Sequence, residues 1–140
     1  MHGTFTVSTK NGQGTCLPNW TPDQTATNIS VDITQNGDQV TATVTGVAAV
    51  ALNTAWGNGA NVYQGTISGT ELHLVARGTR SLSSGSCAFT VDATLNATVS
   101  GDVLTGDIVY TPNTNSSPDC ATVSGCALHQ TFNGTRPPTR

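Results

Sequence analysis

Four side chains that can form hydrogen bonds fall within otherwise apolar strand patterns of this sequence. They are Asn61, Tyr63, Tyr110 and Gln130, and the alternation along each strand turns them toward the apolar face. A mostly apolar pocket with a few placed polar groups is typical of a small-molecule site. The two tyrosine hydroxyls would act there as hydrogen-bond donors or weak acids. The alternative is that these groups satisfy one another or reach solvent at a rim.

Aromatic side chains add to this set. Trp20 and Trp56 lie in segments without a strand pattern, and loop tryptophans at a pocket mouth can stack on a sugar or an aromatic ligand. The alternative is that each tryptophan covers the core as a lid, and the two roles are compatible. Phe89 lies in a strand pattern near the same end and is expected to line the same interior. These seven residues are the candidate ligand-binding residues.

Three histidines raise the question of a metal site, because three imidazoles can form a catalytic zinc centre. Strand parity turns His73 and His129 outward, and His2 lies near the opposite end of the expected fold, so no shared metal site is predicted. Serines are plentiful, but none stands in a G-x-S-x-G motif. The catalytic residues of a possible enzyme therefore stay unknown at this point, and no cofactor is predicted.

The four cysteines, Cys16, Cys87, Cys120 and Cys126, fit two disulfides, and four cysteines allow three connectivities. Metal binding would need closer ligand pairs such as C-x2-C, and none occurs. Cys120 and Cys126 bracket a short loop, so we predict that they pair with each other and that Cys16 pairs with Cys87. Two disulfides would place the protein in an oxidising compartment.

The composition narrows the classes of partner. The chain has 140 residues, a net charge of −3 and only 9% charged residues, without a basic run, so a nucleic-acid or anionic-membrane partner is not expected. The longest apolar-rich run, Val47 to Leu52, is far shorter than the ~20 residues of a membrane helix. We expect a secreted, periplasmic or cell-surface protein whose leader is absent from this chain.

An internal repeat organises the chain into hairpins. Gly37, Gly69 and Gly101 follow one another at a constant spacing of 32 residues, in Asn-Gly-Asp, Ser-Gly-Thr and Ser-Gly-Asp. Asn-Gly is a strong hairpin signal, because both central positions of a type I′ turn need φ > 0. With each glycine at the second central position, Ile33 pairs with Val40 and the apolar side chains share one face. In the other two hairpins the same rule pairs Gly65 with Leu72 and Ala97 with Leu104.

Two further alternating segments bring the predicted strands to eight, at residues 3–9, 28–35, 38–46, 60–67, 70–77, 87–99, 102–111 and 125–135. Tight turns alternate with long loops, at residues 10–27, 47–59, 78–86 and 112–124, so an antiparallel meander gathers every long loop at one end. Pairing the first strand with the last would remove two aggregation-prone edges. We therefore predict an all-β fold with a single domain over residues 1–140. It is a closed eight-stranded antiparallel up-and-down barrel, and a β-sandwich is the alternative.

Four segments match a known group of barrels. They are Gly3-Thr4-Phe5, Asn36-Gly37-Asp38-Gln39-Val40-Thr41, Ser100-Gly101-Asp102-Val103-Leu104-Thr105 and Phe132-Asn133-Gly134-Thr135. In these segments and in its architecture the sequence resembles the calycins, the group of avidin-like and lipocalin-like barrels. The resemblance implies a small ligand held at the open end. Phe5 stands where those families usually carry a tryptophan, and their tryptophan-rich biotin pocket has no counterpart, so biotin binding is not implied. Small cyclase barrels of the allene-oxide-cyclase type share this shape.

The expected function is that of a secreted small-ligand-binding barrel, which holds a largely apolar small molecule at its long-loop end. A small barrel enzyme, either a cyclase or isomerase or a hydrolase, that uses Tyr63, Tyr110 and Gln130 is the first alternative. A surface or structural protein without a small ligand is the second. The loop tryptophans and interior polar groups favour the first two functions, and the lack of an acid–base or metal constellation favours binding over catalysis.

Overall fold

A computed structural model describes residues 1–137, which form nine β-strands, one α-helix and one short 3-10 helix. In chain order the elements are β1 (Gly3–Asn11), β2 (Thr25–Asn36), β3 (Gln39–Val44), α1 (Gly46–Trp56), β4 (Val62–Ser68), β5 (Glu71–Arg77), β6 (Leu82–Ser84), β7 (Cys87–Ser100), β8 (Val103–Thr114), η1 (Pro118–Thr122) and β9 (Leu128–Thr135).

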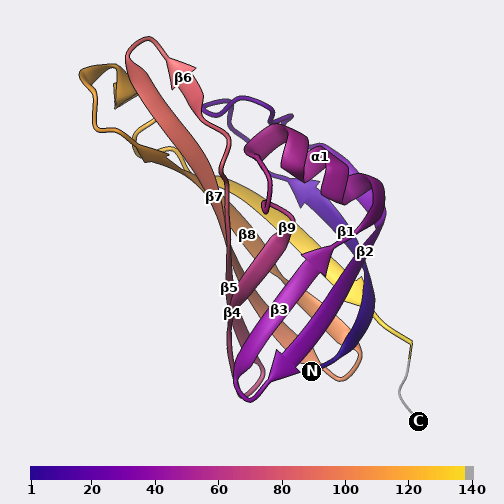
Figure 1. Ribbon diagram of the computed structural model, residues 1–140. Coiled ribbons are helices and arrows are strands. Elements are labelled where there is room, and N and C mark those ends of the chain that lie inside the picture. The colour runs from indigo at the N-terminus through magenta and orange to yellow at the C-terminus, as the bar shows by residue number, and fades with distance from the viewer. Residues whose placement is uncertain (138–140) are drawn as a thin grey trace.

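Eight of these strands close into a barrel (Figure 1). Each strand pairs antiparallel with the next in the order β1, β2, β3, β4, β5, β7, β8 and β9, and β9 pairs back with β1. The closed up-and-down barrel predicted from the sequence is confirmed. The β-sandwich alternative is wrong. In an open sandwich the first and last strands would stay unpaired with each other, whereas β1 and β9 form a continuous ladder here.

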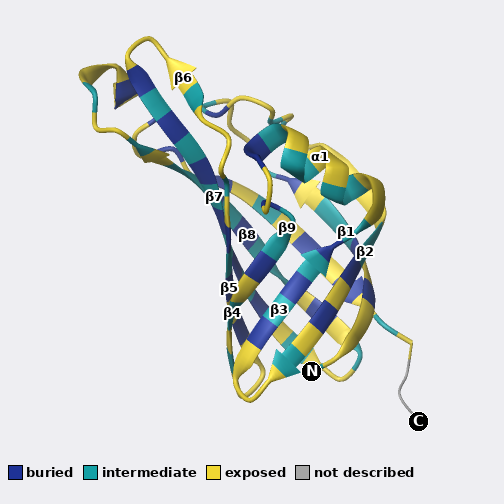
Figure 2. Cartoon of the chain, viewed as in Figure 1, coloured by how far each residue is buried: buried dark blue, intermediate teal, exposed yellow. Residues whose placement is uncertain are grey.

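Alternating burial marks the inside of the wall (Figure 2). Along the first eleven residues of β7, buried side chains alternate with partly exposed ones, as expected for a strand with one face toward a core. Phe5, Leu72 and Leu74 are fully buried on the inner face. The Thr and Val content of these strands suits such a half-buried pleated surface.

The tight hairpins form where the sequence predicts them, but their register differs by two residues. Each turn holds its glycine at the first central position, with φ of 64°, 61° and 61° at Gly37, Gly69 and Gly101. A type II′ turn needs positive φ only at that position. Because the side-chain period is two, this shift leaves every side chain on its predicted face. The corrected pairs are Ile33 with Ala42, Gly65 with Leu74, and Ala97 with Gly106.

The segment predicted as a long loop at residues 47–59 forms α1 instead. It holds four alanines and a leucine, which are strong helix formers. Gly57 ends the helix at φ 109°, and its amide donates to the main-chain oxygen of Asn53 (2.9 Å). Figure 1 shows α1 across the long-loop end of the barrel. Within residues 1–137, no helix has the length and apolar character needed to cross a membrane.

Both disulfides lie at the long-loop end, but the predicted pairing is wrong. The bonds join Cys16 to Cys126 and Cys87 to Cys120. The reason is that β7 and β8 extend beyond the barrel, where β6 pairs with the start of β7 (Figure 1). The 3-10 helix η1 packs against this extension and brings Cys120 to Cys87, with Cα atoms 4.9 Å apart. The first long loop, which carries Cys16, instead lies next to the segment before β9, which carries Cys126.

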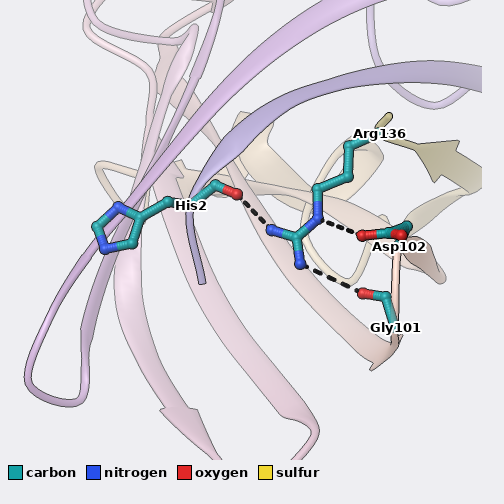
Figure 3. Close-up of polar contacts among 4 residues, drawn as sticks. All are labelled: His2, Gly101, Asp102 and Arg136. Carbon is teal, nitrogen blue, oxygen red and sulfur yellow. Dashed lines mark hydrogen bonds and ion pairs between the residues drawn. The ribbon is translucent and has the colours of Figure 1, made fainter. Parts of the chain in front are cut away.

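An arginine closes the tight-turn end. The Arg136 guanidinium donates to the Asp102 carboxylate (2.9 Å). It also donates to the main-chain oxygens of Gly101 (3.5 Å) and His2 (Figure 3). Its carbon lies 5.2 Å from the centroid of the Phe5 ring, in a cation–π contact. Arg136 thus connects the chain start, the β7–β8 turn and the floor of the core.

Replacement of this arginine tests how much the closure contributes. We expect Arg136→Ala to lower the free energy of unfolding by about 2–3 kcal/mol, because it removes charge-assisted hydrogen bonds and a cation–π contact. The matched control is Arg77→Ala, since Arg77 contacts Asp92 at 3.4 Å with 75% of its side chain exposed. Such an exposed pair contributes about 0.2–1 kcal/mol. Urea denaturation measures both variants, and equal losses would contradict an organising role for Arg136.

Candidate functional site

A cavity of about 610 Å³ occupies the interior of the barrel and opens at the long-loop end. An eight-stranded barrel is just wide enough either to be filled by side chains or to hold one small ligand. The volume found here lies within the range of small-molecule sites. Its deeper wall is apolar and comes from six strands, with Ile33, Ala42, Leu72, Leu74, Leu95, Leu104, Ile108 and Phe132.

The mouth of the cavity lies between α1, the first half of β2 and Trp20. α1 contributes Trp56 and five aliphatic side chains, namely Val47, Ala48, Ala51, Leu52 and Ala55. On β2 the register against β1 is interrupted between Val7 and Thr9, and Asn28 adopts a φ of 58° at this bulge. Bulges bend a strand and re-aim its side chains, and they are common beside functional sites.

Tyr110 lies between two tryptophans at this mouth. Its ring centroid is 5.4 Å from that of Trp20 in an edge-on arrangement and 5.9 Å from that of Trp56 in a tilted one. Such geometries are favoured between aromatic rings. Trp56 is the last residue of α1, and Trp20 belongs to the first long loop, where its indole N–H donates to the Gly12 oxygen (3.4 Å). The end of α1 and the first long loop therefore both pack against the ring of Tyr110.

A directed series of hydrogen bonds runs from Tyr110 into the wall. The Tyr110 hydroxyl donates to Gln130 Oε1 (3.4 Å), and Gln130 Nε2 donates to Asn11 Oδ1 (2.7 Å). Asn11 Nδ2 then donates to the main-chain oxygen of Thr21 (2.9 Å). Asn11 is only 8% exposed, so these bonds satisfy a buried amide that would otherwise be costly.

The two tyrosines are buried side by side. Burial raises the pKa of Tyr63 well above 10, and the charge and the hydroxyl of Tyr110 raise it further. Burial also raises the pKa of Tyr110, whereas the hydroxyl of Tyr63 lowers it. Both hydroxyls remain protonated at neutral pH.

None of the described residues that line the cavity carries a charged side chain. His73 and His129 do not line the cavity either, because both are exposed on the outside of the barrel. There His73 is hydrogen-bonded to Asn96 (2.6 Å), and His129 is paired with Asp107 (3.7 Å). A charged group that entered the cavity would lose its hydration without gaining a counter-ion, at a cost of several kcal/mol. The site therefore favours neutral occupants.

Most of the residues proposed from the sequence meet at this cavity. Five of the seven line it, namely Trp20, Trp56, Tyr63, Tyr110 and Gln130. The other two lie elsewhere. Asn61 Nδ2 donates to the Val44 oxygen (2.9 Å) and secures the end of the β3–β4 pair. Phe89 is buried in the β6–β7–β8 extension, opposite Leu82 and Thr114.

Sequence reasoning missed two parts of the site. The sequence prediction ends the first strand at Thr9 and so places Asn11 in a loop, whereas β1 runs to Asn11, which shares the inward parity of Phe5 and Val7. Continuing the alternation by one more pair would have found it. The helix at the mouth was missed as well, although its alanine-rich composition was a usable signal.

Both ends of α1 are bonded to the barrel. At the carboxyl end, the Trp56 oxygen accepts hydrogen bonds from the amides of Thr79 (2.9 Å) and Arg80 (2.8 Å). The Arg80 charge also complements the negative end of the helix dipole. At the amino end, the amide of the N-cap residue Thr45 donates to the Ser30 oxygen of β2 (2.9 Å). The helix is therefore held across the mouth at both ends.

The protonated tyrosines can be tested by alkaline titration. The chain has two tyrosines, so tyrosinate absorbance has no other source. In the native protein we expect no tyrosinate signal near pH 10, whereas in guanidinium both residues titrate at about pH 10. Because the folded pKa values are raised, their contribution to stability is fully present below pH 10 and is lost as the pH rises above it.

Near-ultraviolet circular dichroism recorded along the same titration tells ionisation from unfolding. The tyrosinate signal should appear only together with loss of the native spectrum. Ionisation near pH 10 with the native spectrum intact would contradict the buried arrangement of Tyr63 and Tyr110.

Comparisons of this chain with protein-family models, with curated proteins and with solved structures find no match. The function therefore has to be argued from the geometry of the cavity.

Proposed function

We propose that the protein binds a neutral, largely apolar small molecule inside its barrel, through the long-loop end. The observation that carries this proposal is the uncharged cavity of about 610 Å³ within a closed barrel. A packed barrel would fill this space with side chains and gain their dispersion contacts. An apolar occupant would regain those contacts and remove apolar wall from water, at roughly 25 cal/mol per Å² of buried surface.

The mouth supports the same proposal. Trp20, Tyr110 and Trp56 form a rigid aromatic wall next to the apolar face of α1. Aromatic side chains offer a large contact area at a low entropy cost, because they have few rotatable bonds. The loop that carries Trp20 also carries Cys16, which is bonded to Cys126. Ordering this loop before binding lowers the entropy cost of binding.

The resemblance to avidin-like and lipocalin-like barrels adds support at the level of architecture, since such barrels hold ligands in their interior. The alternative, a barrel enzyme that uses this cavity, calls for a group that exchanges a proton near neutral pH. Burial moves the pKa of both Tyr63 and Tyr110 away from that range. Binding is therefore placed ahead of catalysis.

The two disulfides support a secreted, periplasmic or cell-surface location for this activity. Disulfides form and persist in oxidising compartments and are rare in reducing ones. A binding protein in such a compartment would meet its ligand outside the cytosol.

Filling the cavity tests the proposal directly. Ala42 lines the cavity and is 3% exposed, so Ala42→Phe places a ring inside it. We expect the parent protein to bind a neutral apolar dye such as Nile red, and Ala42→Phe to bind it about tenfold more weakly or worse, a loss of about 1.4 kcal/mol. Fluorescence titration of the dye gives both affinities.

The matched control is Thr43→Phe, which adds the same ring at the neighbouring residue of β3, on the other face of the sheet. This variant should bind the dye as the parent does. Equal affinity in the parent and in Ala42→Phe, or no binding by the parent, would contradict the proposed function.

A further inference from the structure

The amide groups beside Tyr110 set the direction in which its hydroxyl donates. The Thr21 oxygen can only accept, so the Asn11 amide turns its nitrogen toward it (2.9 Å). Asn11 Oδ1 then accepts from Gln130 Nε2 (2.7 Å), and Gln130 Oε1 is left to accept the Tyr110 proton (3.4 Å). An occupant of the cavity that took this proton would leave Gln130 Oε1 without its donor.

The hydroxyl of Tyr63 faces the cavity without a protein partner. Within residues 1–137, the bond from Tyr110 to Gln130 is the only one made by a tyrosine hydroxyl. Among side chains in this range that are not exposed, Asn53 Oδ1 is the one polar atom that is both sealed from solvent and unbonded. The unbonded Tyr63 oxygen is therefore not sealed, although the residue is only 3% exposed. Because Tyr63 lines the cavity, the space that reaches this oxygen is the cavity itself.

The surroundings of Tyr63 set it apart from the other hydroxyl groups of the lining. Tyr63 pairs with Ala42 across the β3–β4 ladder, beside the apolar deep wall. A donor in apolar surroundings is costly to leave unbonded. The serine and threonine residues of the lining are all partly or fully exposed, namely Thr9, Thr25, Thr27, Ser30 and Thr45.

We propose that the ligand is a neutral carbonyl compound, such as a ketone or an ester, and that Tyr63 donates its hydroxyl proton to the carbonyl oxygen. A carbonyl group carries no charge, which suits the uncharged lining, and its oxygen only accepts, which suits a free donor. The hydrocarbon part of the ligand then lies against the deep wall. Tyr63 is thus a specificity-determining residue, and this inference rests on the proposed function.

A pair of isosteric probes tests the inference on the intact protein. Cyclododecanone and methylidenecyclododecane share one carbon ring, and a CH2 group in the second replaces the carbonyl oxygen of the first. Displacement of Nile red gives both affinities in the parent and in Tyr63→Phe, which removes the hydroxyl and keeps the ring. We expect this substitution to lower the ratio of ketone to alkene affinity about fivefold, the usual net worth of one hydrogen bond.

The ratio cancels any change in packing that affects both probes alike. The matched control is Thr43→Val, which removes a hydroxyl from the outer face of β3, where Thr43 pairs with Val62 next to Tyr63. Thr43 does not line the cavity, so this variant should keep the parent ratio.

Infrared spectroscopy of the bound ketone gives a second readout in the parent protein. A hydrogen bond to a carbonyl oxygen lowers the frequency of its stretching band. Bound cyclododecanone should therefore absorb at a lower wavenumber than the same ketone in cyclohexane. In Tyr63→Phe the band should return to the cyclohexane position.

The outcomes separate the two proposals. An unchanged affinity ratio in a folded Tyr63→Phe variant, or a cyclohexane-like carbonyl band in the parent, overturns the role of Tyr63 and leaves the proposed function standing. Failure of the parent to bind Nile red and both probes overturns the proposed function itself. If Tyr63→Phe does not fold, the carbonyl band in the parent decides the inference alone.

Discussion

The pairing of β1 with β9 is the constraint on which the rest of the molecule depends. It joins the first and last strands, removes both free edges of the sheet and encloses the cavity. It also builds the polar part of the site, because its ladder sets Asn11 directly opposite Gln130. These two residues are 119 positions apart in sequence, yet their amides form the shortest bond of the series that runs from Tyr110 to Thr21. Closing the barrel therefore also forms the polar contacts at the mouth of the cavity.

The two ends of the barrel differ in charge. At the tight-turn end, Arg136 and Asp102 place an ion pair over the floor of the core, where a cation can also face the Phe5 ring. At the open end, the lining is uncharged and aromatic. A charged floor costs little because solvent is near, whereas a charge in the deep cavity would have no partner. The mouth at the long-loop end therefore presents an uncharged lining to an occupant.

The alternation of inward and outward side chains along each strand accounts for most of what could be predicted from the sequence. The errors arise where this alternation carries no information. The strands and their inner faces follow from a period of two, which survived a register error of two residues at turns such as Gly37. The partner of each cysteine could not be read this way, because it depends on how far β7 runs beyond the barrel. Asn11 lay one step past a predicted strand end. The segment of α1 lacks a strand pattern and was therefore predicted as a loop, although its alanines favour a helix.

The attachment of α1 at both ends decides where the cavity communicates with solvent. Thr45 ties the amino end to Ser30 of β2, and the Trp56 oxygen ties the carboxyl end to Thr79 and Arg80. A cover held at two points leaves its long side as the boundary of the mouth, facing the first half of β2 and Trp20. The bulge at Asn28 lies along that side. The width of the entrance is therefore set by the course of β2 beside the helix, and a change in the bulge would alter access without altering the deep wall.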